Sequence, residues 1–201
     1  MGQIVVEKNV NGIEGLCVIT PAVHGDSRGY FFESYNLNDM KENGIDITFV
    51  QDNQSMSTKG VLRGLHFQKK YPQTKLVRVI NGAVFDVAVD LRSESKTYGK
   101  WYGIELSEEN KKQFLIPRGF AHGFLVLTDT AEFCYKCDDF YHPNDEGGMA
   151  WNDPEIGIVW PEVVGEYKGT ASAEGYSLDG IDLNLSDKDQ KWLGIKDTFR
   201  F

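Results

Sequence analysis

The chain has 201 residues, enough to bury one sizeable core, so we expect a single domain over residues 1–201. Its net charge of −9 argues against non-specific binding of nucleic acid and of anionic membranes. An anionic ligand would therefore need a local cluster of Arg and Lys.

The N-terminal segment is MGQIVVEKNVNG, with Glu and Lys where a signal peptide would have an unbroken apolar stretch. No apolar run approaches the length of a membrane-spanning helix. The chain holds three Cys, an odd number, and is too large to need disulfides for stability, which is typical of a reducing compartment. These features predict a cytoplasmic protein that contacts no membrane.

Alternation of apolar and polar residues is common along the chain, whereas helical periodicity is scarce. The predicted strands cover residues 4–8, 15–20, 30–36, 48–55, 61–68, 75–80, 83–91, 101–106, 113–117, 119–127, 131–140 and 156–160. Many short strands with few helices are typical of an all-β sandwich or barrel, and a closed or double-sheet jelly roll also protects the strand edges.

The pair Asn81-Gly82 separates two alternating runs. Both residues tolerate positive φ, so the pattern predicts a tight type I′ hairpin.

Two short helices are predicted. One covers 37–43 with Gly44 at its C-terminal end, and the other covers 186–194 with Ser186 as its N-cap. The polar, Gly- and Ser-rich stretch 162–180 is predicted to be a surface loop that leads into the C-terminal helix.

The run VLRGLHFQ, residues 61–68, places a guanidinium and an imidazole in a strand that is otherwise apolar. Burying either group without a partner is costly. In a regular strand Arg63 and His66 would point to opposite faces, unless Gly64 interrupts the alternation. Either the two groups are satisfied core residues, or they line a cavity where something polar binds.

Polar rings recur among apolar neighbours on other strands: His122 within 118–126 and Tyr135 within 131–141. Asp86 lies on a strand face with little bulk. Each of these residues alone is more often part of a satisfied core or its rim. Their recurrence favours a cavity lined by imidazoles and aromatic rings.

Metal and nucleotide-cofactor sites have no support in the sequence. The four His residues are never close together in the chain, and Cys134-x-x-Cys137 lies in a predicted strand that would point its sulfurs to opposite faces. No Gly-rich phosphate loop of the Rossmann or Walker type occurs. We expect neither a catalytic metal nor a cofactor.

Eight sequence blocks, in order, resemble the dTDP-4-dehydrorhamnose 3,5-epimerases, which are cofactor-independent enzymes of dTDP-L-rhamnose synthesis. The most specific blocks are RGLHFQ and IPRGFAHGF. The eight blocks are residues 49–55, 59–68, 75–79, 82–92, 116–124, 131–136, 151–161 and 185–189. The resemblance implies a cupin-like double-stranded β-helix, or jelly roll, with a few short helices. The chain departs from the usual pattern in the 162–180 insert and in the C-terminal sequence DTFRF.

The resemblance also implies a mechanism on a dTDP-4-keto-6-deoxy sugar. Inversion at C3 and C5 requires a base, a stabiliser for the enolate oxygen and an acid on the other face of the ring. By resemblance His66 is the base, oriented by Asp189, and Tyr135 is the acid. Lys75 is the cation beside the keto oxygen, with His122 close to the same site.

Further residues are implied to bind the substrate. Tyr141 would stack on thymine, and Arg63 and Lys188 would meet the pyrophosphate. Arg63 and His66 would then both face the ligand, which predicts that Gly64 breaks the alternation of the strand. Arg28 and Glu33 would reach the ligand from a second subunit, which implies a homodimer that exchanges its N-terminal strands. The remaining implied contacts are Gln51, Asp52, Asn53 and Glu146.

Alternatives remain. A relative could invert only C3 or only C5, and a 3,4-ketoisomerase fits the blocks less well. A non-catalytic sugar-nucleotide binder would need neither His66 nor Lys75, and a cupin oxygenase would need a metal.

Overall fold

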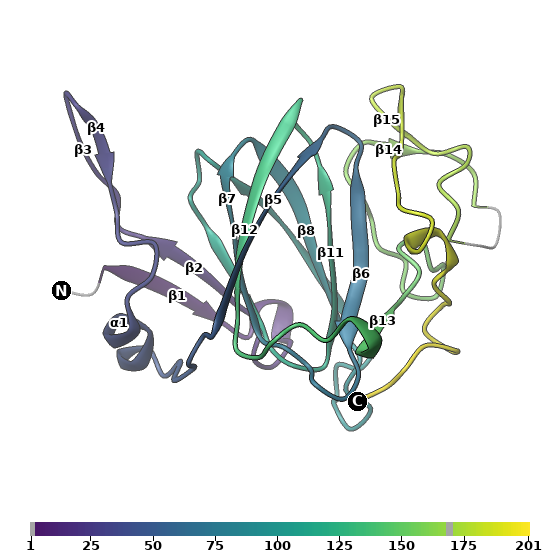
Figure 1. Cartoon of the computed structure of the whole chain (residues 1–201), viewed down its shortest axis with the longest axis horizontal. Coiled ribbons are helices and arrows are strands. Elements are labelled where there is room, and N and C mark those ends of the chain that lie inside the picture. Colours follow the sequence, from purple (N-terminus) through teal and green to yellow (C-terminus); the bar gives the residue numbers. More distant parts are fainter. Residues whose placement is uncertain (1–2, 168–170) are drawn as a thin grey trace.

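The computed structural model describes residues 3–167 and 171–201, which form two large antiparallel sheets packed face to face (Figure 1). The first sheet has the order β1 (Ile4–Lys8), β2 (Cys17–Pro21), β10 (Gln113–Ile116), β7 (Lys75–Asn81), β12 (Thr130–Cys137) and β5 (Gln51–Thr58). The second has the order β13 (Glu146–Gly148), β6 (Leu62–Gln68), β11 (Phe120–Val126), β8 (Ala83–Asp90) and β9 (Trp101–Ser107). The predicted all-β jelly-roll class is confirmed.

Five short strands lie outside the two large sheets. These are the hairpin β3 (His24–Asp26) and β4 (Gly29–Phe31), and the three strands β14 (Val163–Val164), β15 (Ser177–Leu178) and β16 (Ile181–Asp182). The sequence did not predict β3 or β13 to β16. Of the predicted strand 30–36 only the first residues pair, and residues 156–160 form no strand.

The main core fills the space between the two sheets. Phe114 and Phe133 from the first sheet and Phe124 from the second are buried there, and the rings of Phe124 and Phe133 stack with centroids 4.2 Å apart. Burial of each such ring contributes roughly 1.5–3 kcal/mol. This core occupies one part of the space between the sheets.

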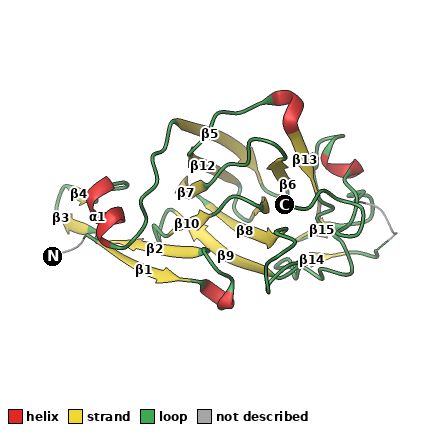
Figure 2. Ribbon diagram, turned by 90° about the horizontal axis from the view of Figure 1, so that it is seen from below, coloured by secondary structure: helices red, strands yellow, loops and turns green. Residues whose placement is uncertain are grey.

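A second core covers the outer face of the second sheet. The segment after β13 folds back over β8 and β11, and it buries Trp151 and Leu185 against Val87 and Leu125. Figure 2 shows this segment on one side of the molecule and the N-terminal hairpin at the opposite end. The second sheet is therefore apolar on both faces.

The segment's final residues are tied to the sheet. The Phe201 N–H donates to the carbonyl of Leu91, and the Phe201 carbonyl accepts from the N–H of Ser93. The Phe201 ring packs edge-on against Phe67, with centroids 5.5 Å apart.

The prediction of a hairpin at Asn81-Gly82 is wrong. β7 and β8 belong to different sheets, and Asn81 pairs with Glu132 of β12. Gly82 has φ 75°, and a Cβ there would lie 2.1 Å from the carbonyl oxygen of Thr130. Gly82 therefore lies where the chain crosses from one sheet to the other, and the absence of a side chain lets its backbone lie close to β12.

The predicted helix at 37–43 is confirmed as α1 (Leu37–Glu42). The Asn36 side chain caps it by accepting from the N–H groups of Asn38 and Asp39, at 3.0 and 3.4 Å. Gly44 follows with φ 75°.

The predicted helix at 186–194 is wrong. The chain makes only a 3₁₀ turn, η3 (Asp189–Lys191), although the Ser186 hydroxyl accepts from the Asp189 N–H at 3.2 Å as an N-cap would. Trp192 is already extended, with φ −64° and ψ 141°. Contacts of Asp189 and Trp192 with the second sheet, described below, replace the further helical turns.

The stretch 162–180 is not the simple surface loop that was predicted. It contains β14 and β15, and Ala171 and Tyr176 are buried, with the Tyr176 ring 4.9 Å from that of Trp151. Residues 168–170 of this prediction lie outside the described residues. The insert is therefore part of the cover over the second sheet.

Within the described ranges, no helix is both long and apolar enough to cross a membrane.

Candidate active site

A cavity of about 520 Å³ lies between the two sheets, beside the main core. Side chains from both sheets and from the segment before η3 line it, which is why residues far apart in the sequence meet there. The lining includes Arg63, Lys75, His122, Tyr135, Lys188, His66 and Asp189 among the predicted site residues.

The bend in β6 brings Arg63 and His66 to this one cavity. His66 pairs with His122 on β11, but Arg63 pairs with Phe124, so β6 passes three residues where β11 passes two. Gly64 lies at this irregularity with φ 117°, and a Cβ there would be 2.7 Å from the His122 carbonyl oxygen. The predicted break in the alternation at Gly64 is confirmed.

His66 and Asp189 form a hydrogen-bonded dyad. His66 Nε2 lies 2.5 Å from Asp189 Oδ1, and the Gly64 N–H donates to Oδ2 at 3.3 Å. The Asp189 side chain is buried, which opposes its ionisation, but the hydrogen bonds from His66, Gly64 and Trp192 outweigh this effect and hold its pKa below the usual value. An ionised Asp189 keeps a proton on Nε2 and leaves the lone pair on Nδ1.

Behind the dyad lies a second pair of an imidazole and a carboxylate. His122 Nε2 is 3.0 Å from both carboxylate oxygens of Asp86, which is fully buried. Burial raises the pKa of Asp86 and lowers that of His122, because each charged form loses its hydration. Lys75 also faces this pair, and burial of its ammonium lowers its pKa, because the charged form loses its hydration. This part of the cavity is therefore built from polar groups that are buried and paired with each other.

Tyr135 approaches from the first sheet, whereas His66 lies on the second. It pairs with Asn53 of β5 and Val77 of β7 and so points to the same inner face as Lys75. Burial raises the pKa of its phenol, so the hydroxyl keeps its proton at neutral pH. Base and phenol candidates thus belong to the two facing sheets.

Several predicted binding residues form polar pairs beside the cavity, and of these only Lys188 is part of its lining. Lys188 Nζ lies 2.7 and 2.8 Å from the two carboxylate oxygens of Glu146. Gln51 donates to the Asn53 side chain at 3.0 Å and accepts from the Tyr141 N–H at 3.0 Å. The Tyr141 side chain is half exposed and so offers a ring face to a ligand.

Three further predicted binding residues are also absent from the lining of this cavity and are held by other contacts. Asp52 points to the outer face of the first sheet, where it pairs with Lys136 at 2.6 Å. Arg28 pairs with Asp26 in the β3–β4 hairpin, which projects away from the sheets (Figure 1).

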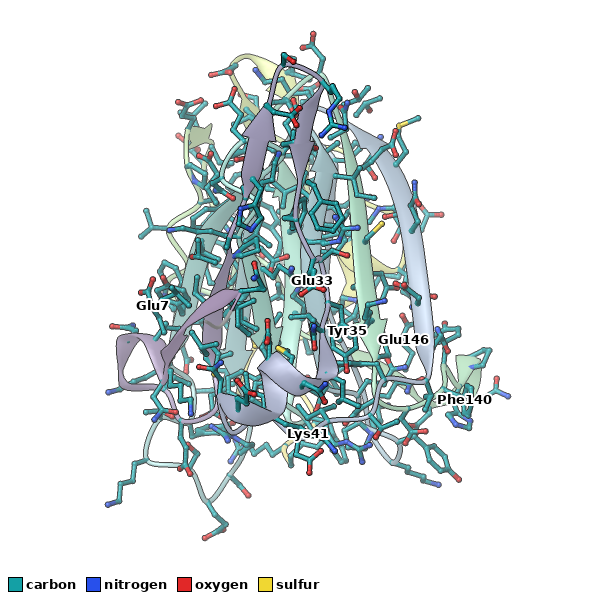
Figure 3. The ribbon with its side chains drawn as sticks, turned by 90° about the vertical axis from the view of Figure 1, so that its left-hand side faces the viewer. Glu7, Glu33, Tyr35, Lys41, Phe140 and Glu146 are labelled. Atoms are coloured by element: carbon teal, nitrogen blue, oxygen red, sulfur yellow. The ribbon has the colours of Figure 1, made fainter. Side chains whose placement is uncertain are left out.

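Glu33 follows the same hairpin and accepts from the Asn36 side chain at 3.0 Å. In Figure 3 Glu33 lies on the N-terminal arm in front of the sheets, and Glu146 lies to its right and lower in the view.

Two site residues were not predicted from the sequence. Asp86 was noted only as an acidic group on a face with little bulk, and its pairing with His122 depends on neighbouring strands. Trp192 donates to Asp189 from Nε1 at 3.2 Å. The sequence did not predict this contact, because the pattern of residues 186–194 predicts a helix. Among residues 3–167 and 171–201, no group of three or more His, Cys, Asp and Glu is placed to hold a metal ion.

The sequence and the fold both match proteins of one family. The family model described as dTDP-4-dehydrorhamnose 3,5-epimerase matches residues 11–197. The enzyme of that name from Methanothermobacter thermautotrophicus is 50% identical over 187 residues, covering 92% of each chain, and that from Escherichia coli is 51% identical, covering 84% of this chain and 92% of its own. The crystal structure of a dTDP-6-deoxy-D-glucose-3,5-epimerase from Legionella pneumophila, in complex with dTDP-4-keto-L-rhamnose, superposes with a TM-score of 0.84 at 45% identity, covering 96% of this chain and 94% of that one. With this agreement between family model, relatives and fold, the chain belongs to the dTDP-4-dehydrorhamnose 3,5-epimerase family.

Proposed function

We propose that this chain epimerises dTDP-4-dehydro-6-deoxy-D-glucose at C3 and C5 to give dTDP-4-dehydro-L-rhamnose, without a cofactor. The observation that carries the proposal is the shared cavity, which combines His66 of one sheet and its partner Asp189 of η3 with Tyr135 and Lys75 of the other sheet. The family membership and the solved relative with bound dTDP-4-keto-L-rhamnose support this substrate class.

The C4 ketone acidifies the hydrogens on C3 and C5, so the reaction needs only proton transfer and stabilisation of an enolate. His66 takes the proton through Nδ1, because Asp189 holds the other ring nitrogen in its protonated form. The negative charge then develops on the C4 oxygen. The ammonium of Lys75, with His122 beside it, stabilises that charge in a part of the cavity where both groups are buried and electrostatic interactions are stronger than in water.

Inversion requires that the proton returns from the opposite face of the ring. Tyr135 is suited to this step because its phenol stays protonated and it lies on the sheet that faces His66. A phenol is a weak acid, but the enolate carbon is basic enough to accept its proton.

The nucleotide end of the substrate binds at the rim. Arg63, which donates from Nε and Nη2 to the Ser57 hydroxyl, and Lys188 supply positive charge for the pyrophosphate. Tyr141 stacks on thymine, and Gln51 and Asn53 contact the same part of the ligand.

Incubation with dTDP-4-dehydro-6-deoxy-D-glucose in D₂O tests the proposed function. We expect deuterium at both C3 and C5 of the product, read by NMR, because one base serves both positions. Exchange at only one carbon would replace the proposal by a single-centre epimerase, and no exchange at either carbon would refute it.

The chain is also proposed to act as a homodimer that exchanges its N-terminal arm, as a single-domain protein of the cytoplasm. The β3–β4 hairpin carries Tyr30 and Phe31, which are 60% and 67% exposed, so the arm offers apolar rings to another surface. Arg28 and Glu33 belong to this arm and lie outside their own cavity. Both features are accounted for if the arm completes the site of a partner.

Mixing two inactive variants tests this exchange. We expect Arg28→Ala alone to lower kcat/KM by about 10- to 100-fold, since it removes a charged contact to the ligand. In mixed dimers with His66→Asn, one of the two sites has both His66 and a partner's Arg28. Random reassembly should then restore about a quarter of the wild-type activity. An Arg28 that served its own chain would give no restoration.

A further inference from the structure

The indole of Trp192 contacts the catalytic dyad from outside the substrate cavity. Its Nε1–H donates at 3.2 Å to Asp189 Oδ1, the same oxygen that lies 2.5 Å from His66 Nε2. The indole also meets the His66 ring edge-on, with centroids 6.3 Å apart and an interplanar angle of 76°. One oxygen therefore accepts from two ring N–H groups that are held at a near-perpendicular angle.

The neighbouring strand is shaped to admit this indole. Gly148 of β13 pairs directly with His66, and a Cβ at Gly148 would lie 2.3 to 2.5 Å from three atoms of the Trp192 ring. Any side chain there would push the indole away from Asp189. Trp192 lines a separate hollow of about 460 Å³ whose lining does not include Asp189, whereas Asp189 lines the substrate cavity, whose lining does not include Trp192. The indole is thus a wall between the carboxylate and that hollow.

We propose that Trp192 is a positioning residue, which fixes the Asp189 carboxylate and limits how strongly it draws a proton onto His66. This rests on the proposed function, in which His66 is the base. An oxygen that accepts from two donors has its charge shared between them, so the carboxylate holds the His66 N–H in place without fully stabilising an imidazolium.

Asp189 itself shows the effect of its donors, since hydrogen bonds from His66, Gly64 and Trp192 hold its pKa down despite burial. Other titratable or charged groups also line the cavity or its rim and act on the dyad. These are Arg63, Lys75, His122, Tyr135, Glu146 and Lys188. None of them is altered by removing the indole N–H, so a change in the dyad can be assigned to Trp192.

Trp192→Phe removes the N–H and keeps an aromatic ring. We expect the acid limb of the kcat/KM–pH profile to move to higher pH by about 0.5 to 1 unit, because Asp189 then stabilises the protonated dyad more strongly. At a pH below the limb kcat/KM should fall about 3- to 10-fold against wild type, with a change of less than about 3-fold on the plateau. A purely structural role would lower activity equally at all pH values.

A second variant tests the same hydrogen bond by displacing the indole without replacing it. Gly148→Ala leaves Trp192 intact but displaces its ring, so it should move the acid limb in the same direction. Trp160→Phe is the matched control, since it removes the indole N–H that donates to the Trp151 carbonyl at 3.0 Å, in the cover over the second sheet. We expect a lower Tm and an unmoved limb in that control.

The pH titration of the His66 ring-proton NMR signal gives a readout that needs no substrate. Its midpoint should rise in Trp192→Phe and Gly148→Ala, whether or not the chain acts on the proposed sugar. An unmoved midpoint in either variant that retains its fold, judged by thermal unfolding, overturns the role of Trp192. If the wild-type protein shows no activity on the proposed sugar, the proposed function is refuted, whereas the role of Trp192 is still decided by the NMR titration.

Discussion

His66→Asn is expected to abolish exchange of both the C3 and the C5 proton of the substrate. Asn retains a polar side chain but has no basic nitrogen, so the proton has no acceptor, and kcat should fall by about 10²- to 10⁴-fold or more. Because one residue serves both carbons, the two exchange rates should fall together. The measurement is deuterium incorporation at each carbon, followed by NMR under single-turnover conditions.

A matched control for this variant is His142→Asn. The His142 ring stacks on that of Tyr71, with centroids 4.1 Å apart, and His142 is not part of the cavity lining. It should exchange both protons at about the wild-type rate. Retention of exchange at C5 in His66→Asn, with loss only at C3, would mean that a second base exists and would remove His66 from half of its role.

Tyr135→Phe is expected to separate inversion from exchange. The base can still remove and return a proton on its own face, so exchange at C3 and C5 should fall by less than about 10-fold. Net inversion needs the missing phenol and should fall by about 10²- to 10³-fold. The ring itself remains, so its packing against Phe133, with centroids 6.0 Å apart, should be kept.

The pH dependence adds a check on the same residue. Burial raises the pKa of the Tyr135 phenol, so loss of its proton should limit wild-type inversion only at a pH above the ordinary range for tyrosine. That basic limb should disappear from the inversion profile of Tyr135→Phe. Equal losses of exchange and inversion in the variant would show that Tyr135 acts in both steps or in binding, and not as the acid.

Local sequence patterns predicted the strand content well and its connections poorly. Alternation identified β6, β8 and β11, because side chains on a strand must match the two faces of a sheet. The pair Asn81-Gly82 has the chemistry of a hairpin turn, yet it joins two different sheets. Turn propensity describes only the residues of the turn, and the pairing of Asn81 with Glu132 depends on a strand fifty residues later.

The sequence predicted several residues of the candidate site, but it did not predict which of these residues contact one another. The irregularity at Gly64 could be foreseen once the family resemblance assigned both Arg63 and His66 to the ligand, because the two side chains can share a cavity only if the strand loses its regular alternation. The partnership of Asp86 with His122 and the reach of Trp192 to Asp189 join segments that no sequence spacing relates. The 186–194 segment illustrates the reason that local patterns fail here. Its capping signal is present, but hydrogen bonds to distant residues decide its conformation.

The cover over the second sheet has a consequence for how the protein is made. Both β8 and β11 face this cover, and its outermost contact is the pairing of Phe201 with Leu91 and Ser93. During translation the strands emerge well before the residues that shield their outer side. The nascent chain therefore exposes the outer apolar residues of β8 and β11 until the covering segment has been synthesised, and exposed apolar surface of this kind favours aggregation.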